Sequence, residues 1–284
     1  QFGMGAAISS AREYHNQIRL NARAVGIASD EAMLAQDDMF DSMVKGSINT
    51  QAEAWNTHQA FFKTSAAYRQ ASTEIQTTAG DLGMALEKRL GIPTTETAGM
   101  FQELTTTFHK TGKEANTLTA DLAMMARSQK MDVNKYFGDF QQMSANLAKF
   151  GLPDIKKEFN ALAVIQEKTG ASMHSLVGAM DTFSTFEGAL NASSKLNAAF
   201  GTTIDGMEIM DTLMKEGPAK SMLLLRQRLE ETGTSFDDMN YAQKNAMASA
   251  SGMDMGTLQK FMSTPFTELE EAVAKSGGTI EGTK

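Results

Sequence analysis

Closely spaced helix start and stop signals near the C-terminal end constrain the fold of this chain most strongly. Pro218 suits the first position of a helix, and Gly233 supplies the left-handed residue that ends it. The next helix is expected to begin after an N-cap at Ser235 and to stop at Gly252. Asp254 then caps a further helix. This spacing, with no strand pattern between the signals, predicts short helices packed on one another.

The composition agrees with a helical protein and excludes several functions. The chain has 284 residues, enough for one large domain or two ordinary ones, and a net charge of −8 that argues against a nucleic-acid-binding surface. It contains no cysteine, which excludes disulfides and thiolate sites. Only 4 prolines and as many as 21 methionines favour helices with adaptable packing surfaces. We therefore expect an all-α fold.

A seven-residue repeat marks the N-terminal third. Thr50 and Glu53 form a capping box, and no Gly or Pro follows before Gly80, which predicts one long helix. Large residues recur every seventh position and have small residues three positions later. The large residues, called the heptad seam below, are Phe61, Tyr68, Ile75 and Leu82. Two interpretations are open: a self-association seam, or a long amphipathic helix packed within its own domain.

The expected helices become shorter after Gly91-Ile92-Pro93, which predicts a domain boundary there. The segment ends a helix because the residue before a proline avoids the helical region. Residues 1–92 are expected to form long amphipathic helices with the heptad seam. Residues 93–275 are expected to form a compact multi-helix domain of shorter helices. Residues 276–284, which begin Ser-Gly-Gly, are expected to form a flexible end or linker.

No constellation of catalytic residues is visible in the sequence. The histidines are scattered without a ligand at metal spacing, and each is expected on an exposed helix face; they are His15, His58, His109 and His174. The adjacent carboxylates Glu230-Glu231 and Asp237-Asp238 are explained by a solvated face and by helix capping. We therefore predict no catalytic, cofactor-binding or metal-ligating residue and no enzymatic activity.

Four segments carry a resemblance to a known family. They are L-N-A-A-F-G-T (Leu196–Thr202), L-R-Q-R-L-E-E-T-G (Leu225–Gly233), S-F-D-D-M-N-Y-A-Q-K-N-A-M-A (Ser235–Ala248) and G-M-D (Gly252–Asp254). With their flanks, residues 108–262 resemble the helical region of tail tape measure proteins of contractile- or long-tailed bacteriophages. Whole members of that family are far longer and contain hydrophobic spans, so the resemblance implies a portion of a longer chain.

The resemblance implies a structural virion protein located in the tail tube lumen or at the tail tip and baseplate. Such a protein sets tail length inside the tube, anchors at the baseplate and leaves during genome ejection. The implied partners are further copies of the chain, in a homo-oligomer such as a trimer, and the tail tube and baseplate hub proteins. Contact with the host envelope would come from parts outside this chain. No cofactor and no specific nucleic-acid binding are implied.

Two other classes of function compete with this interpretation. A helical adaptor or chaperone-like module would bind partner helices through Met-rich apolar grooves. An enzyme, such as a cell-wall hydrolase attached to a tail protein, would need an acid–base pair that capping does not already explain.

Overall fold

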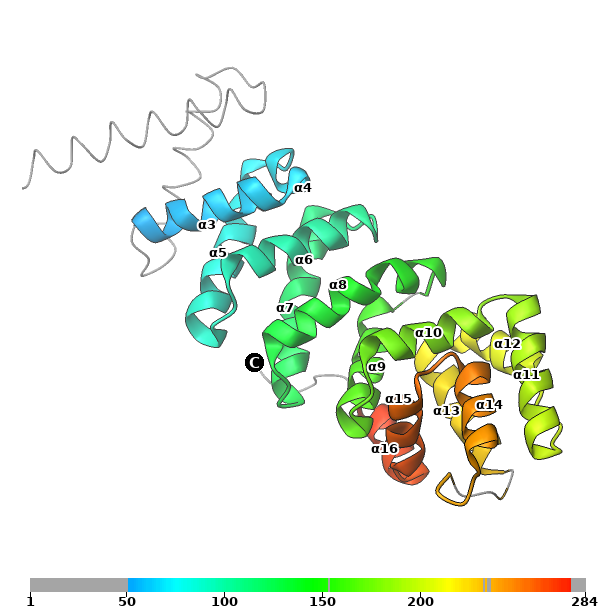
Figure 1. Cartoon of the computed structure of the whole chain (residues 1–284). Helices are drawn as coiled ribbons and strands as arrows, with labels where there is room; N and C mark the ends of the chain where they lie inside the picture. Colours follow the sequence, from blue (N-terminus) through cyan, green and yellow to red (C-terminus); the bar gives the residue numbers. More distant parts are fainter. Residues whose placement is uncertain (1–50, 153, 232, 234–235, 277–284) are drawn as a thin grey trace, which may run out of the picture. The chain divides into compact units, whose positions relative to one another are not determined.

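The computed structural model describes residues 51–152, 154–231, 233 and 236–276. The described residues form α-helices joined by short loops and contain no β-strand (Figure 1). The all-α prediction is therefore confirmed. Most of the segment for which long helices were expected, residues 1–50, lies outside the described residues.

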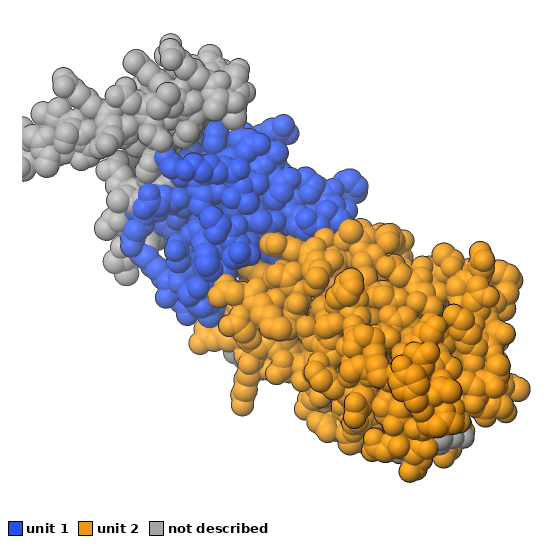
Figure 2. Space-filling view, viewed as in Figure 1, with its two compact units in different colours: residues 1–120 blue, residues 121–284 orange. Residues whose placement is uncertain are grey.

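The chain divides into two compact units, residues 1–120 and residues 121–284 (Figure 2). The division falls inside α7 (Gly112–Ser128), whereas the sequence placed a boundary after Ile92. The reason is that α6 (Thr94–Thr106), which follows the predicted boundary, packs against the helices that precede it. The Gly91-Ile92-Pro93 segment therefore separates two helices, α5 and α6, that belong to the same compact unit.

The described part of unit 1 contains three helices where one long helix was predicted. They are α3 (Gln51–Thr64), the four-residue α4 (Ala66–Arg69) and α5 (Thr73–Leu90). The prediction of one continuous helix is wrong because two serines act as caps. The hydroxyl of Ser65 accepts a hydrogen bond from the Tyr68 backbone N–H at 3.0 Å, and Ser72 caps α5 in the same way. Such side chains offer the backbone an alternative to helix continuation.

Aromatic rings form the centre of unit 1. Phe61 packs with Tyr68 at 5.0 Å between ring centroids, and each ring also meets Phe101 of α6 edge-on. His58 of α3 contacts Phe62 and Tyr68, both at 5.5 Å. These five residues, called the ring cluster below, are all buried. Aromatic pairs of this kind contribute about 0.5–1.5 kcal/mol each beyond their buried area.

Unit 2 holds nine helices among its described residues in addition to the end of α7. They are α8 (Val133–Lys149), α9 (Ile155–Thr169), α10 (Met173–Phe183), α11 (Phe186–Phe200), α12 (Gly206–Glu216), α13 (Pro218–Glu230), α14 (Tyr241–Ser251), α15 (Met255–Ser263) and α16 (Phe266–Ser276). The middle of α9 is buried continuously from Phe159 to Ile165 because α8, α10, α13, α15 and α16 all pack against it. It is the central element of this unit.

Most of the helix signals that the sequence showed here are confirmed. Pro218 opens α13, Gly252 ends α14 with φ 73°, and Asp254 caps α15. At Gly252 only a glycine fits, because an added Cβ would lie 2.6 Å from the Gly178 carbonyl oxygen. The helix expected after Ser235 instead begins at Tyr241.

The later start of α14 follows from a better cap. Asn240 accepts a hydrogen bond from the Gln243 backbone N–H at 2.9 Å, and the Gln243 side chain accepts one from the Asn240 N–H at 3.1 Å. This reciprocal capping box satisfies two backbone donors at once. Phe236 and Met239, which were expected on the helix, lie before it and are still buried.

The last described residue, Ser276, belongs to the fold. It ends α16, is buried, and its carbonyl oxygen accepts a hydrogen bond from Asn160 Nδ2 of α9 at 2.8 Å. The helical domain thus extends one residue further than predicted. The remainder of the predicted flexible end, residues 277–284, lies outside the described residues.

Candidate functional site

The heptad seam does not lie on one helix. Phe61 and Tyr68 are fully buried in the ring cluster, on α3 and α4, whereas Ile75 and Leu82 are half-buried on α5. The Ile75 side chain packs closely against Gly112 of α7, where an added Cβ would meet its methyl group. Two of the four residues are therefore core residues of the single chain, and only Ile75 and Leu82 share a helix.

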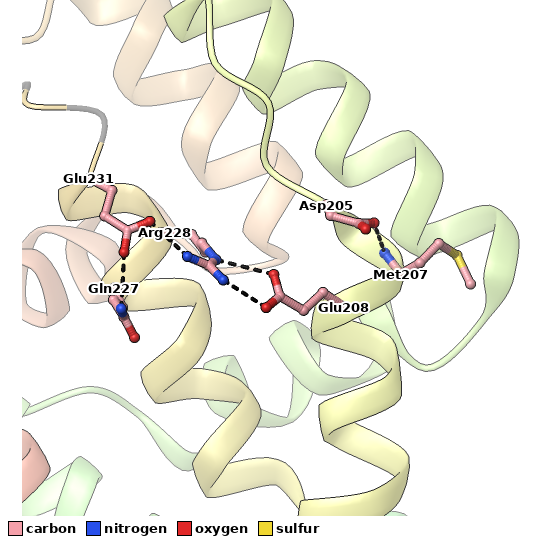
Figure 3. Close-up of polar contacts among 6 residues, drawn as sticks. All are labelled: Asp205, Met207, Glu208, Gln227, Arg228 and Glu231. Carbon is pink, nitrogen blue, oxygen red and sulfur yellow. Dashed lines mark hydrogen bonds and ion pairs between the residues drawn. The ribbon is translucent and has the colours of Figure 1, made fainter.

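A polar hollow in unit 2 brings four charged side chains together at the surface. It has a volume of about 450 Å³ and lies where the loop after α11, the start of α12 and the end of α13 meet. Its lining residues are Thr202, Thr203, Ile204, Asp205, Glu208, Arg228 and Glu231. Figure 3 shows four of these residues with Met207 and Gln227.

Asn197 of α11 gives the loop side of the hollow its shape. Its Nδ2 donates to the Ile204 carbonyl oxygen at 3.0 Å, and its Oδ1 accepts from the Ile204 N–H at 2.6 Å and the Thr202 hydroxyl at 3.1 Å. Asp205 then caps α12 by accepting from the Met207 N–H at 2.8 Å (Figure 3). The loop is thus fixed by local side chain–backbone bonds.

Arg228 of α13 occupies the opposite side. Its Nε and Nη2 donate to the two carboxylate oxygens of Glu208 at 3.1 and 2.7 Å, and its Nη1 donates to Glu231 at 2.9 Å (Figure 3). Gln227 donates a further hydrogen bond to Glu231 at 2.9 Å. The fork-shaped pairing with Glu208 has the bidentate geometry that guanidinium and carboxylate groups favour. It fastens α12 to α13.

The electrostatics of Arg228 and Glu231 describe an ion pair held in its charged form. The hydrogen bonds from Arg228 and Gln227 lower the pKa of Glu231, and the bonds to Glu208 and Glu231 raise the pKa of Arg228. Both changes favour the charged forms. Asp205, Glu208 and Glu231 outnumber the one guanidinium, so the hollow carries a formal charge of −2.

A second arginine of α13 is buried. Arg226 donates to the carbonyl oxygens of Phe261, Met262 and Thr264, at 3.3, 2.9 and 3.3 Å, and its side chain is 4 % exposed. A positive charge at a helix C-terminus complements the helix dipole, here that of α15. Glu230 pairs with it at 2.8 Å. Burial lowers the pKa of Arg226, while the charge of Glu230 acts in the opposite direction.

Some of these residues carried a sequence signal and others did not. The pair Glu230-Glu231, interpreted as a solvated face, is exposed as expected, and its two members also form ion pairs with Arg226 and Arg228. Glu208 and Arg228 are 20 positions apart on different helices, so no local pattern could join them. The histidine prediction is confirmed for His174, which is exposed on α10. It is wrong for His58, which is fully buried, and for the helical placement of His109, which is exposed but lies in the loop between α6 and α7. His15 lies outside the described residues.

Within the described ranges, no three His, Asp or Glu side chains lie close enough together to hold a metal ion. No helix of the described part is both long and apolar enough to cross a membrane. Comparisons of the chain with models of protein families, with curated proteins and with solved structures found no match.

Proposed function

We propose that this chain is part of a bacteriophage tail tape measure protein and acts as a structural element of the virion. The support is the resemblance of residues 108–262. One observation gives it weight: all four segments that carry it belong to unit 2 and contribute to its helix ends and helix contacts. The resemblance therefore involves residues that help to determine the fold of unit 2.

Each segment contributes a specific contact. Asn197 in the first segment shapes the loop before α12, and Arg226 in the second caps the C-terminus of α15. The capping box at Asn240 in the third starts α14. In the fourth, Asp254 caps α15 and accepts a hydrogen bond from Ser175 of α10. A chain that shares these positions would need the same helix ends and helix pairings.

In this proposal unit 2 is the anchored element of the tape, at the tail tip or baseplate hub, and the parent chain continues along the tube lumen. Its work is mechanical: packed helices resist or transmit force, and no reacting group is needed. The proposed partners are further copies of the chain, tail tube proteins and hub proteins. Tail length is then set by the chain that spans the tube, and the protein leaves ahead of the genome.

The proposal is tested by cross-linking and mass spectrometry of purified phage particles from the host that carries the gene. Cross-links from surface lysines of unit 2, such as Lys195 and Lys244, to tail tube or hub proteins are the expected result. A chain recovered only from the soluble lysate, with no peptide in purified tails, would contradict it. Particles emptied of their genome should have lost the chain.

Self-association through α5 belongs to the same proposal. Ile75 and Leu82 lie seven residues apart on this helix, and both are half-buried in the single chain. Because Ile75 also packs against Gly112, Leu82→Asp is the cleaner test. Its mass in solution, measured by light scattering, should fall from that of an oligomer to that of a monomer. An unchanged mass would exclude α5 as the contact.

A second candidate, a helical adaptor, is favoured by one surface feature. Phe186 and Leu190 are 62 % and 43 % exposed and lie one helical turn apart on α11. An exposed apolar pair of this kind suits contact with a partner helix. Binding of amphipathic helical peptides, abolished by Leu190→Asp, would support the adaptor. Absence of binding together with the tail cross-links would exclude it.

A further inference from the structure

Helix α12 of unit 2 packs against its neighbours on one part of its circumference. Gly206 faces α11, where an added Cβ would collide with the backbone of that helix. Glu208 faces α13 through its fork with Arg228. Ile209 and Leu213 lie between these two directions and are fully buried. The rest of the circumference is left as surface.

This outward side of α12 carries methionines. Successive residues of a helix are about 100° apart, which places Met207, Met210 and Met214 on one stripe. Met214 is 42 % exposed, and the other two are half-buried. The outward face of a packed helix is normally polar, so three methionines there need a reason beyond the fold. These three residues are called the methionine stripe below, and they are distinct from the exposed pair Phe186 and Leu190 of α11.

The methionine stripe borders the polar hollow. Met207 and Glu208 are consecutive residues, and Figure 3 shows their side chains leaving α12 in different directions, with Glu208 toward Arg228. Asp211 lies between the stripe and Glu208 on the helix surface and pairs with Lys215 at 2.9 Å, where both side chains are exposed. The hollow itself carries a formal charge of −2. An apolar stripe therefore runs beside an acidic surface.

We propose that the methionine stripe and the polar hollow together bind an amphipathic helix of a partner protein, one whose polar edge is rich in lysine and arginine. Its apolar side covers the stripe, because methionine side chains adapt to the shape of a bound helix. Its basic edge lies over Asp211 and the hollow, where opposite charges meet. A second copy of the chain fits less well, since each copy has a net charge of −8. The inference goes beyond the tail proposal, because it requires no position in a virion.

Fluorescence anisotropy of the full chain with two labelled helical peptides tests the chemistry of the partner. Both peptides carry the same apolar face of Leu and Ala, and their polar edge is lysine in one and glutamate in the other. The chain should bind the lysine peptide in preference to the glutamate peptide, and added salt should weaken that binding. Equal binding of the two peptides, or no binding of the lysine peptide, would overturn the proposal.

A substitution in the stripe tests the apolar contact. Met214→Gln replaces an exposed apolar side chain with a polar one of similar length and should weaken binding of the lysine peptide about tenfold. Met124→Gln on α7 is the matched control, because Met124 is 45 % exposed on a different helix, and it should bind as the wild type does. Equal affinities of the two variants would contradict the proposal. A fall in the mass of Met214→Gln alone, measured by light scattering, would assign the stripe to a contact between copies instead.

A pair of double variants tests the acidic contact. Asp211→Asn with Glu231→Gln removes two negative charges beside the stripe, and should weaken binding of the lysine peptide and reduce its dependence on salt. Glu270→Gln with Glu271→Gln removes two exposed negative charges from α16 and should leave both quantities unchanged. Equal weakening in the two double variants would show a general attraction to an acidic protein and would overturn the assigned site.

Discussion

The two units solve the same problem, the packing of short helices, with different side chains. Unit 1 is centred on the ring cluster, in which the buried polar atoms belong to an imidazole and a phenol. Unit 2 has a buried guanidinium, Arg226, at the C-terminus of α15, and the exposed carboxylate of Asp254 caps the N-terminus of the same helix. One unit therefore has a neutral polar pair at its centre, and the other has charged groups at the two ends of a packed helix.

This difference teaches where each unit is vulnerable. A buried neutral histidine is penalised when it gains a proton, and burial lowers the pKa of His58 to about 4. Charged caps in unit 2 are satisfied by backbone groups that do not titrate. Hydrogen bonds from Ser175 and Thr257 hold the pKa of Asp254 well below its usual range. Substitutions should separate the two units in the same way.

The largest expected effect comes from removing a central ring. Phe159 of α9 packs edge-on against Tyr136 and Phe140, at 4.7 and 5.0 Å between centroids. Phe159→Ala should destabilise unit 2 by about 3–5 kcal/mol, because it leaves a cavity in a close-packed core. Phe101→Ala is the matched change in unit 1. Hydrogen exchange should show each variant loosening only its own unit; equal loosening of both units would contradict the comparison.

Removal of the buried arginine should cost nearly as much. Arg226→Met leaves the carbonyl oxygens of Phe261 and Met262 and the carboxylate of Glu230 without this donor. The expected loss of unfolding free energy is about 3 kcal/mol. Urea denaturation followed by circular dichroism measures it. The control is Arg228→Met, because Arg228 lies on the same helix and forms a more exposed ion pair. An equal loss of unfolding free energy in both variants would contradict the role of burial.

Loss of the α15 cap should have an intermediate effect. Asp254→Ala removes bonds to the Thr257 N–H and the Ser175 hydroxyl and should cost about 1–2 kcal/mol, whereas Asp254→Asn retains the cap and should cost less. The lowered pKa of Asp254 means that its contribution is complete above pH 3.8 and is lost as the pH falls further. Denaturation at several pH values checks this. A difference that already vanishes near neutrality would be inconsistent with the depressed pKa.

The smallest effect is expected at the polar hollow. Arg228→Lys keeps the charge but loses the fork to Glu208, and exposed pairs of this kind contribute about 1 kcal/mol or less. The thermal midpoint should shift slightly, and less in high salt than in low salt. A loss as large as that of Arg226→Met would show that the hollow has a role in stability that its exposure does not suggest.

Local signals made part of this fold predictable. Pro218, Gly252 and Asp254 act on their own backbone, so their effect could be inferred from the sequence. The heptad seam led to the wrong prediction of one continuous helix, because a seven-residue repeat carries no information about the competing caps at Ser65 and Ser72. Neither the Glu208–Arg228 fork nor the burial of His58 has a local cause. Both follow from which helices meet, and no spacing in one sequence encodes that.

The claim that this chain belongs to a tail tape measure is tested most directly by tail length. An in-frame insertion of about 20 helical residues into the parent gene, outside residues 51–276, adds about 30 Å of extended helix. Electron microscopy of the resulting particles should show tails longer by up to that amount. The control is the parent gene without the insertion and with only Arg228→Lys, which should give tails of the original length. Normal tails of unchanged length from the lengthened gene would contradict the account.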